Sequence, residues 1–366
     1  MRSLQSDLLR MGALLIASFT SVVFGQTDSS SKPGDSARAA SVSVQADGTV
    51  EIPTEAVPPS KFLTPEARAY LVQHLHDMQD PTMTYVEKGV PRFMKTYLER
   101  DKVLFPVSME DTKVGGVHAF VYLPATELKT ANQNRVLMNL HGGGFSGCWP
   151  GCAELESRPI ASLGGIKVVS VDYRQGPENK FPAASEDVAS VYRELLKTYK
   201  PENIGIYGCS AGGMLTSESV AWFQTHTLPR PGAIGVFCAS AGEFGGDATY
   251  TSTPLGEGRL MPATGDGGVR LGYFSDTNPK DPLVAPLYSA EAMSKFPPTL
   301  VMTGTRDFAM SGAIYTHSEL VRLGVDADLH VWEGLFHGFF YNPDIPESRD
   351  AYAVTINFFD KHLGKK

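Results

Sequence analysis

The chain has 366 residues, of which 42% are hydrophobic and 20% charged, and its formal net charge is −8 at pH 7. This much apolar material supports one large domain with a smaller accessory element, and it excludes a disordered or fibrous protein. No run of lysine or arginine is long enough to form a nucleic-acid surface, so we expect no nucleic-acid partner.

The first 25 residues have the pattern of an export signal. Arg2 and Arg10 precede a mostly apolar stretch from Met11 to Phe24, which ends before Gly25. This stretch falls short of the roughly 20 apolar residues that span a bilayer, so we expect a removable signal peptide over 1–25 and no stable membrane insertion. The sequence therefore predicts an exported protein, periplasmic or secreted, with cleavage after Gly25.

Residues 26–59 are rich in Ser, Ala, Asp, Thr and Pro without a sustained apolar period, which predicts a flexible leader. A main domain is then expected over 60–366. Thr64-Pro65-Glu66 is typical of a helix start, and a second helical segment is predicted near Pro91 to Arg100. We expect both helices, over about 60–100, to belong to a cap and not to the sheet.

Apolar runs typical of strands follow these helices and alternate with helical stretches. The predicted strands are Val103–Phe105, Val117–Leu123, Val136–Leu140, Val168–Val171, Asn203–Tyr207, Ala233–Cys238, Thr299–Thr303 and Asp328–Trp332. The predicted helices are Glu154–Leu163, Ala183–Tyr199, Ser210–Thr225, Ala309–Leu323 and Asp350–His362. This alternation predicts an α/β fold with a mostly parallel central sheet flanked by helices, and it places the chemistry at the carboxyl ends of the strands.

The segment from about 242 to 286 breaks this alternation. It is rich in Gly, Thr and Pro and has no long period, and long connections of this kind are often lids or binding elements. We interpret it as the second half of the cap, folded with the N-terminal helices over the site.

The pentapeptide Gly208-Cys209-Ser210-Ala211-Gly212 lies between a predicted strand and a predicted helix. That is the context of a nucleophile elbow, in which a sharp turn lifts the serine hydroxyl out of the sheet. Glycines on both sides let the strand and the helix approach closely, and the helix N-terminus favours negative charge. Ser210 is therefore the candidate nucleophile.

A glycine run, Gly142 to Gly144, follows the predicted strand that ends at Leu140 and the intervening His141. Glycine lets backbone N–H groups approach a reacting carbonyl without a side chain in the way. We expect Gly143 and Gly144, together with the N–H of Ala211, to form an oxyanion hole. The alternative is a flexible turn. We expect His141 itself to be structural, with a hydrogen bond inside its loop.

A serine nucleophile needs a base, and the base needs an orienting acid; in this fold context both follow the serine, with the acid first. Asp307 is the candidate acid because it lies in the loop after the strand Thr299–Thr303. Asp281, Asp328 and Glu333 fit less well by position. The alternative role for Asp307 is that of a helix cap.

The candidate base is His337, one of nine histidines. It follows the strand Asp328–Trp332 in a loop that can carry the imidazole over the serine. His330 lies within that strand and His317 within a helical run, so we expect packing or surface roles for both.

Four cysteines raise the question of disulfides in an exported chain. Only three residues separate Cys148 from Cys152, in a turn-like segment, and spacing alone leaves open whether they are bridged. Cys209 and Cys238 lie in apolar stretches where buried free thiols are common.

With these motifs in place, the chain resembles the hormone-sensitive-lipase-like branch of the α/β hydrolases, which includes the family IV bacterial esterases. The residues that carry the resemblance are His141–Phe145, Val171–Arg174, Gly176–Glu178, Phe181–Ala184, Gly208–Gly213, Asp307 and His337–Phe339. The resemblance covers roughly residues 60–366. It implies an α/β-hydrolase fold with a helical cap, no metal and no organic cofactor, and hydrolysis of short- to medium-chain carboxylic esters through an acyl-enzyme intermediate.

Carried across residue by residue, the resemblance assigns roles to six positions. These are Ser210 as nucleophile, Asp307 as orienting acid, His337 as base, and Gly143, Gly144 and Ala211 as oxyanion donors. Two departures matter. Cys209 stands where the family usually has an acidic residue or threonine, and Phe308 and Ser311 stand where it often has a proline and a second acid. The neutral Cys209 removes a charge near the triad, which leaves the pH optimum and the subfamily open.

Two other functions use the same scaffold. An amidase or peptidase would use the same triad, and a ligand-binding protein would have lost the chemistry. His337 is present, which argues against the second reading. The sequence leaves open the natural small-molecule ester substrate and whether the chain forms a homo-oligomer.

Overall fold

The computed structural model describes residues 42–52, 55–87, 89–260 and 272–364. The chain divides into two units, residues 1–56 and residues 57–366. The predicted signal peptide and most of the predicted leader lie outside the described residues. In the first unit, β1 (Ser43–Val44) and β2 (Val50–Glu51) form an antiparallel pair. Within the described ranges, no helix has the length and apolar character needed to cross a membrane.

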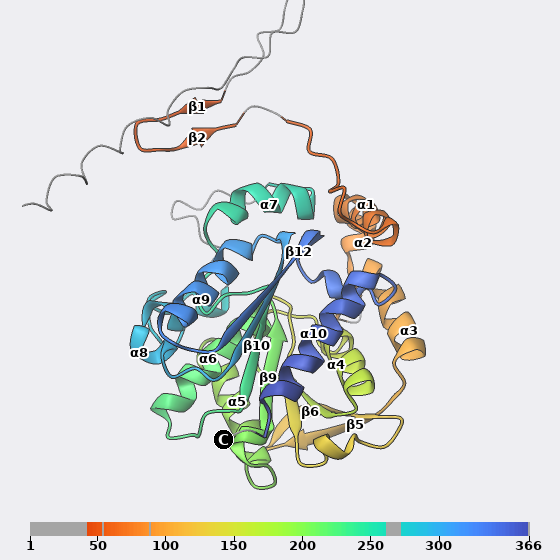
Figure 1. The fold of residues 1–366 in the computed structure, drawn as a ribbon, viewed down its shortest axis with the longest axis vertical. Helices are drawn as coiled ribbons and strands as arrows, with labels where there is room; N and C mark the ends of the chain where they lie inside the picture. Colours follow the sequence, from red (N-terminus) through yellow and green to blue (C-terminus); the bar gives the residue numbers. More distant parts are fainter. Residues whose placement is uncertain (1–41, 53–54, 88, 261–271, 365–366) are drawn as a thin grey trace, which may run out of the picture. The chain divides into compact units, whose positions relative to one another are not determined.

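An eight-stranded sheet forms the centre of the second unit (Figure 1). Its strands lie in the order β12-β11-β10-β9-β7-β8-β6-β5. Their bounds are β5 (Val107–Val114), β6 (Val117–Pro124), β7 (Val136–Leu140), β8 (Lys167–Val171), β9 (Ile204–Cys209), β10 (Ala233–Phe237), β11 (Thr299–Arg306) and β12 (Ala327–Phe336). Only the β5–β6 and β6–β8 pairs are antiparallel; the other pairs are parallel. The predicted α/β fold with a mostly parallel sheet is confirmed.

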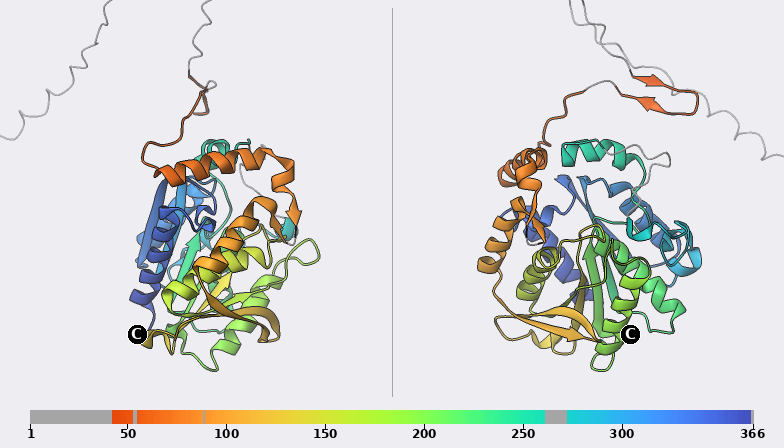
Figure 2. Two further views of the ribbon diagram at one scale, coloured as in Figure 1. Left: turned by 90° about the vertical axis from the view of Figure 1, so that its right-hand side faces the viewer. Right: turned by 180° about the vertical axis from the view of Figure 1, so that it is seen from behind.

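Helices cover both faces of this sheet (Figure 2). On one face α3 (Lys95–Leu104) packs on α4 (Gly151–Gly164), and α4 packs on α10 (Pro346–His362). On the other face α5 (Ala183–Leu195) packs on α6 (Ala211–Thr225), and α8 (Ala290–Met293) contacts both α6 and α9 (Met310–Arg322). The sheet is therefore the middle layer of three.

The side chains of each central strand alternate between two hydrophobic cores. Along β9, Tyr207 belongs to the core with α4 and α10, where its ring lies 5.9 Å from that of Phe359. Its neighbour Ile206 belongs to the opposite core, with Leu215 of α6. Strands buried on both faces explain why these segments read as nearly continuous apolar runs.

The N-terminal helices begin where the sequence predicts. Helix α1 (Pro65–Gln79) starts after Thr64, whose hydroxyl oxygen accepts a hydrogen bond from the backbone N–H of Ala67. Helix α2 (Pro81–Thr84) follows, and β3 (Val86–Glu87) then pairs with β4 (Val90–Pro91). The second predicted helical segment is the short 3-10 helix η1 (Arg92–Met94) followed by α3.

The predicted strand Val103–Phe105 is wrong. Val103 and Leu104 form the end of α3, and β5 begins only at Val107. This apolar run ends a helix: Phe105 is buried in the core, and Pro106 stops the helix from continuing. Strand β5 itself was not predicted. It is an edge strand whose residues are mostly exposed and polar, so it lacks the apolar pattern of a core strand.

The segment predicted as the second half of the cap contains a helix, α7 (Asp247–Glu257), and the 3-10 helices η4 (Gly272–Phe274) and η5 (Pro286–Tyr288). Residues 261–271 lie outside the described part of the chain. Helix α7 packs against α1 and against strands β11 and β12. The two predicted parts of the cap therefore contact each other; their common role as a cap stays a prediction.

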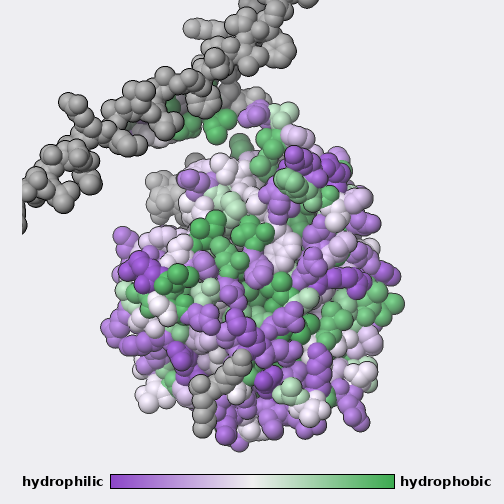
Figure 3. All heavy atoms as spheres, viewed as in Figure 1, coloured by the Kyte–Doolittle hydropathy of each residue, from purple (hydrophilic) through white to green (hydrophobic). Residues whose placement is uncertain are grey.

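The surface of the second unit mixes hydrophilic and hydrophobic residues on the face shown in Figure 3. The exposed apolar side chains of this unit include Ile314, Tyr315 and Val321 of α9 and Val331 of β12. Such a mixture is ordinary for a globular domain, since apolar atoms make up much of any protein surface.

Candidate active site

Four parallel strands end directly before the predicted site residues. Strand β7 ends before His141, β9 before Ser210, β11 before Asp307 and β12 before His337. Since the carboxyl ends of parallel strands share one edge of a sheet, these positions lie along the same edge. The topology thus gathers segments that are nearly 200 residues apart in the sequence.

Ser210 stands in the sharp turn between β9 and α6. Its backbone has φ 57° and ψ −121°, a conformation that L-residues rarely adopt and that stores about 1–3 kcal/mol of strain. Two glycines make the turn feasible. A Cβ atom at Gly208 would lie 2.1 Å from the carbonyl oxygen of Leu140, and one at Gly212 would lie 1.7 Å from the same oxygen. The local geometry is that of a nucleophile elbow.

The backbone around Ser210 is fixed by two hydrogen bonds. Its N–H donates to the carbonyl of Phe237 at 2.8 Å, and its own carbonyl accepts from Met214 at 3.0 Å. The preceding residue, Cys209, is fully buried, and burial raises the pKa of its thiol. A buried, protonated thiol is a poor nucleophile, which argues against Cys209 as the reacting residue of this turn.

Asp307 and His337 form a hydrogen-bonded pair. The Nδ1 atom of His337 lies 2.8 Å from Oδ1 of Asp307, which is fully buried. The hydroxyl of Thr303 donates to Oδ2 at 2.8 Å, and the backbone N–H of Ala309 donates to Oδ1 at 2.8 Å. The last contact lies within the loop before α9, whose N-cap residue is Ala309 with no side-chain capping hydrogen bond, so the alternative role of Asp307 as a helix cap is wrong.

The electrostatics of this pair keep the carboxylate ionised. Burial by itself raises the pKa of Asp307, but the charge and hydrogen bond of His337 outweigh it, so the pKa lies below its ordinary value of 3.8. Burial lowers the pKa of His337, yet Asp307 outweighs that effect and raises the pKa above 6.5. The ring of Phe308 stacks on the imidazole, with centroids 4.2 Å apart. The imidazole is therefore oriented by its hydrogen bond to Asp307 and by the stacked ring of Phe308.

The link between the serine and this pair runs through Cys238. The Sγ atom of Cys238 accepts a hydrogen bond from the N–H of Gly338 at 3.4 Å, and the preceding residue Phe237 holds the backbone of Ser210. The elbow and the histidine loop are thus anchored to consecutive residues. Within the described ranges the Ser210 hydroxyl makes no hydrogen bond to His337. Such contacts often tighten only when substrate binds.

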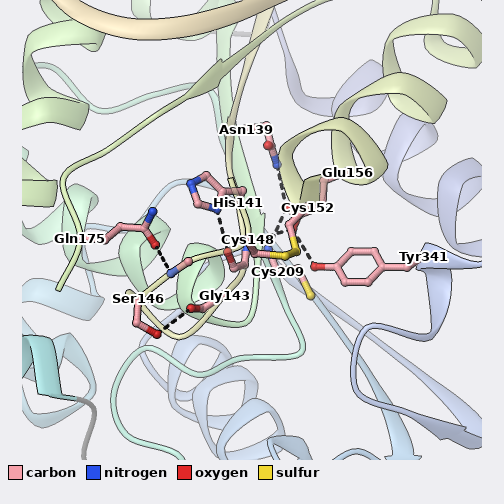
Figure 4. The surroundings of a disulfide bond; sticks show 12 residues. Asn139, His141, Gly143, Ser146, Cys148, Cys152, Glu156, Gln175, Cys209 and Tyr341 are labelled. Atoms are coloured by element: carbon pink, nitrogen blue, oxygen red, sulfur yellow. Dashed lines mark hydrogen bonds between the residues drawn. A yellow bond between two sulfur atoms is a disulfide. The ribbon is translucent and has the colours of Figure 1, made fainter. Parts of the chain in front are cut away.

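The glycine loop after β7 is held by its own turn (Figure 4). Gly143 has φ 118°, and a Cβ atom there would lie 2.3 Å from the carbonyl oxygen of Gly147. The carbonyl of Gly143 accepts from the N–H of Ser146 at 3.1 Å, and Gln175 accepts from the N–H of Gly147 at 3.0 Å. Only glycine fits at position 143 without moving this turn; the role of the loop as an oxyanion hole stays a prediction.

His141 has the structural role that the sequence predicts. It is fully buried, and its Nδ1 atom donates to the carbonyl of Gly142 at 2.7 Å. The hydroxyl of Tyr173 donates to the carbonyl of His141 at 2.6 Å. Burial lowers the pKa of His141 to about 4, so the ring is neutral at pH 7.

Cys148 and Cys152 are joined by a disulfide bond (Figure 4). Cys152 lies in the first turn of α4, and Cys148 lies at the end of the glycine loop. The bond therefore fastens that loop to the helix that follows it, which settles a point that the spacing left open.

The other acids and histidines considered from the sequence do not reach this edge in a catalytic arrangement. Asp281 accepts a hydrogen bond from the N–H of Leu283, and Glu333 is exposed. His330 is exposed on β12, and His317 lies 3.2 Å from the carbonyl of Ala327.

Among the described residues, one group has the side-chain types of a metal site. Ligand atoms of Cys238, Asp307 and His337 lie within 4.8 Å of one another. Burial raises the pKa of the Cys238 thiol well above 9.0, and a metal binds the thiolate. The Nδ1 atom of His337 is already engaged by Asp307. The arrangement suits an acid–base pair better than a metal.

A family model described as alpha/beta hydrolase fold matches residues 137–341. The chain belongs to this alpha/beta hydrolase family. Two crystal structures of esterases superpose on this hydrolase over most of its length. One has a TM-score of 0.73 and 27% identity, covering 86% of this chain and 98% of the other. The second, from the bacterial hormone-sensitive lipase family, has a TM-score of 0.67 and 26% identity, covering 81% and 99%. The resemblance to that branch is confirmed.

Curated relatives are similar over shorter spans of this hydrolase. An acetyl-hydrolase from Streptomyces hygroscopicus is 27% identical over 255 residues, which is 69% of this chain and 84% of that protein. An arylacetamide deacetylase from Oryctolagus cuniculus is 35% identical over 122 residues, 30% of each chain.

Sequence reasoning missed several residues that support the site. Thr303 and Phe308 contact the acid–base pair, and Cys238 joins two loops. Glu156, in α4, accepts hydrogen bonds from the backbone N–H groups of Gly142 and Cys209. No sequence pattern indicates this, because the contacts depend on how the helix packs. A threonine four residues before a catalytic acid, at a strand end, is the one signal that could have been read.

Proposed function

We propose that this hydrolase is a serine carboxylesterase that cleaves short- to medium-chain carboxylic esters. The observation that carries the proposal is the buried Asp307–His337 pair, which lies at the sheet edge shared by the strained Ser210 turn. A buried carboxylate that orients an imidazole makes it a base able to take the proton of a serine hydroxyl. The names of the similar esterases and of the acetyl-hydrolase point in the same direction.

The proposed reaction has two steps. The Ser210 oxygen attacks the ester carbonyl carbon while Nε2 of His337 takes the hydroxyl proton. The carbonyl oxygen becomes an oxyanion, which the backbone N–H groups of Gly143, Gly144 and Ala211 stabilise. The C–O bond to the alcohol then breaks as His337 returns the proton to the leaving alkoxide. Water, activated by the same imidazole, attacks the acyl-enzyme, and Ser210 regains its proton as the carboxylic acid leaves.

The kinetic test is hydrolysis of p-nitrophenyl esters from acetate to laurate. We expect activity that is highest toward acetate and other short chains, and we expect Ser210→Ala to remove it. Ser190→Ala, at a half-buried serine of α5 whose hydroxyl donates to the carbonyl of Glu186, should retain it. Ser210→Ala enzyme with the turnover of the unmodified protein would refute the proposal.

Amide hydrolysis is the second candidate. The similarity to the arylacetamide deacetylase over 122 residues favours it, and the triad chemistry is the same except that a poorer leaving group must be protonated. Acetanilide and phenyl acetate, compared at equal concentration, distinguish the two. A higher kcat/KM toward the anilide would assign the amidase function instead.

We also propose that the mature protein is exported, on the pattern of residues 1–25. Fractionation of expressing cells, followed by N-terminal sequencing of the product, tests this. An N-terminus near Gln26 outside the cytoplasm is expected, and an intact Met1 in the cytoplasm would contradict it.

A further inference from the structure

Helix α4 carries one buried carboxylate, Glu156, which lies near Asn139, Cys209 and Tyr341 (Figure 4). Only 4% of this residue is exposed. Its Oε1 atom accepts from the N–H of Gly142 at 2.9 Å and from the hydroxyl of Tyr341 at 2.8 Å. Its Oε2 atom accepts from Nδ2 of Asn139 at 2.8 Å and from the N–H of Cys209 at 3.3 Å. Every oxygen lone pair of an ionised carboxylate is matched by a donor.

These donors come from the three segments that carry the site. Gly142 precedes the oxyanion donors Gly143 and Gly144, Cys209 precedes Ser210, and Tyr341 lies in η6 (Phe339–Tyr341), four residues after His337. Within the described part of the chain, Glu156 makes no hydrogen bond to a side chain or N–H group that is proposed to act on the ester. The carboxylate instead contacts the backbone or side chain next to each catalytic group, so a shift of one segment is transmitted to the others.

We propose that Glu156 is a positioning residue that holds the oxyanion loop, the serine elbow and the histidine loop in a single arrangement. This rests on the proposed function, because it assumes that those three segments act together on one ester. The disulfide assists from the same helix, since Cys152 lies one turn before Glu156 and ties α4 to the far end of the glycine loop.

The negative charge of Glu156 is part of this role. Burial raises the pKa of Glu156 to about 7, while its four hydrogen bonds act in the opposite direction, so the group is substantially ionised above neutral pH. Its charge also raises the pKa of His337. The titratable groups that face it are His337, Tyr341, Tyr207, Tyr173 and Cys209.

An amide at position 156 cannot reproduce these contacts. Glutamine has the same shape, but its NH₂ group is a donor where Glu156 has an acceptor, so it would face either the Asn139 and Cys209 donors or the Gly142 and Tyr341 donors. The first orientation would release the serine elbow at Cys209, and the second would release both the glycine loop at Gly142 and the histidine loop at Tyr341. Because reaction rates depend steeply on donor alignment, we expect the damage to appear in turnover and not in substrate binding.

The test is Glu156→Gln, measured with p-nitrophenyl acetate beside Glu154→Gln as the matched control. Glu154 lies in the same helix, half a turn away, and pairs with Arg158 outside the site. For Glu156→Gln we expect kcat to fall about 10- to 100-fold with KM within about two-fold, and the acid limb of the kcat/KM profile to move to lower pH. Glu154→Gln should change neither.

Three results would overturn the proposal. They are an unchanged kcat in Glu156→Gln, an equal loss in both variants, and a kcat loss without movement of the acid limb. Before these variants are compared, the unmodified enzyme must show ester hydrolysis that a fluorophosphonate inhibits and that Ser210→Ala abolishes. A failure of this control would contradict the proposed function and not the role of Glu156.

Tyr341→Phe keeps the test decisive if Glu156→Gln does not fold. It removes one of the four donors and leaves the carboxylate and its other contacts in place. We expect kcat to fall about three-fold at constant KM. Where Glu156→Gln does fold, the losses of the two single variants should be non-additive in the double variant. An unchanged kcat in Tyr341→Phe, or additive losses in the double variant, would contradict the positioning role.

Discussion

The two loops that converge on Ser210 are held in place by different forces. The Asp307–His337 side depends on charge, because a buried carboxylate and an imidazole stabilise each other through one hydrogen bond of 2.8 Å. The glycine-loop side depends on backbone geometry, with a positive φ at Gly143 and a disulfide between Cys148 and Cys152. In the proposed mechanism a proton moves on the charged side, whereas the N–H groups of the glycine loop only have to stay in place.

The largest expected effect comes from breaking the charged side. Asp307→Asn keeps the shape of the side chain but removes the charge that orients and stabilises the imidazolium. We expect kcat on p-nitrophenyl acetate to fall about 10⁴-fold, with KM little changed and the fold intact by circular dichroism. Activity within ten-fold of the unmodified enzyme would exclude Asp307 as the orienting acid.

Breaking the geometric side should cost less. In Gly143→Ala the added Cβ atom would lie 2.3 Å from the carbonyl oxygen of Gly147, so the loop must move and the oxyanion donors lose alignment. We expect kcat to fall about 10²- to 10³-fold without movement of the acid limb, because His337 is untouched. Gly116→Ala, at an open glycine that also has a positive φ, serves as a control for backbone strain.

Removing the disulfide tests the covalent part of the same side. The double variant Cys148→Ser/Cys152→Ser should lose about 2 kcal/mol in its free energy of unfolding, as expected for a short closed loop. Activity should decline only a few-fold because Glu156 and the turn hydrogen bonds remain. Urea unfolding measures the first quantity, and equal stability of the double variant and the oxidised protein would show that the bond contributes nothing.

The smallest effect is a pH shift that reports the charged side. The base works only when His337 is neutral, and Asp307 raises its pKa above 6.5. Activity must therefore fall as the pH drops through that raised pKa, and we expect the acid limb of kcat/KM to have its midpoint above pH 6.5. A midpoint below 6.5 in the unmodified enzyme would mean that the carboxylate does not act on the imidazole as described.

The sequence predicted those parts of the molecule whose signal is local. The strands that precede Ser210 and Asp307 are buried along nearly their whole length, and the Gly-x-Ser-x-Gly pattern of the elbow stands within five consecutive residues. Strand β5 was missed because an exposed edge strand needs no apolar pattern. The segment Val103–Phe105 was misassigned because an apolar run that ends a buried helix looks like a short strand.

Glu156 marks the limit of reading the site from the sequence. Its function depends on four partners spread from Asn139 to Tyr341, and no spacing rule connects a helical glutamate to them. The disulfide was likewise left open because bond formation depends on the distance between two Cα atoms, here 5.4 Å, which the number of intervening residues does not determine.

The most direct test of the account is to locate the covalent intermediate. The protein is treated with a fluorophosphonate, digested and mapped by mass spectrometry, with Asp307→Asn treated in parallel. We predict one adduct, on Ser210, that forms far more slowly in Asp307→Asn. An adduct on any other residue, or none in a protein that still hydrolyses p-nitrophenyl acetate, would contradict the central claim that Ser210 is the nucleophile.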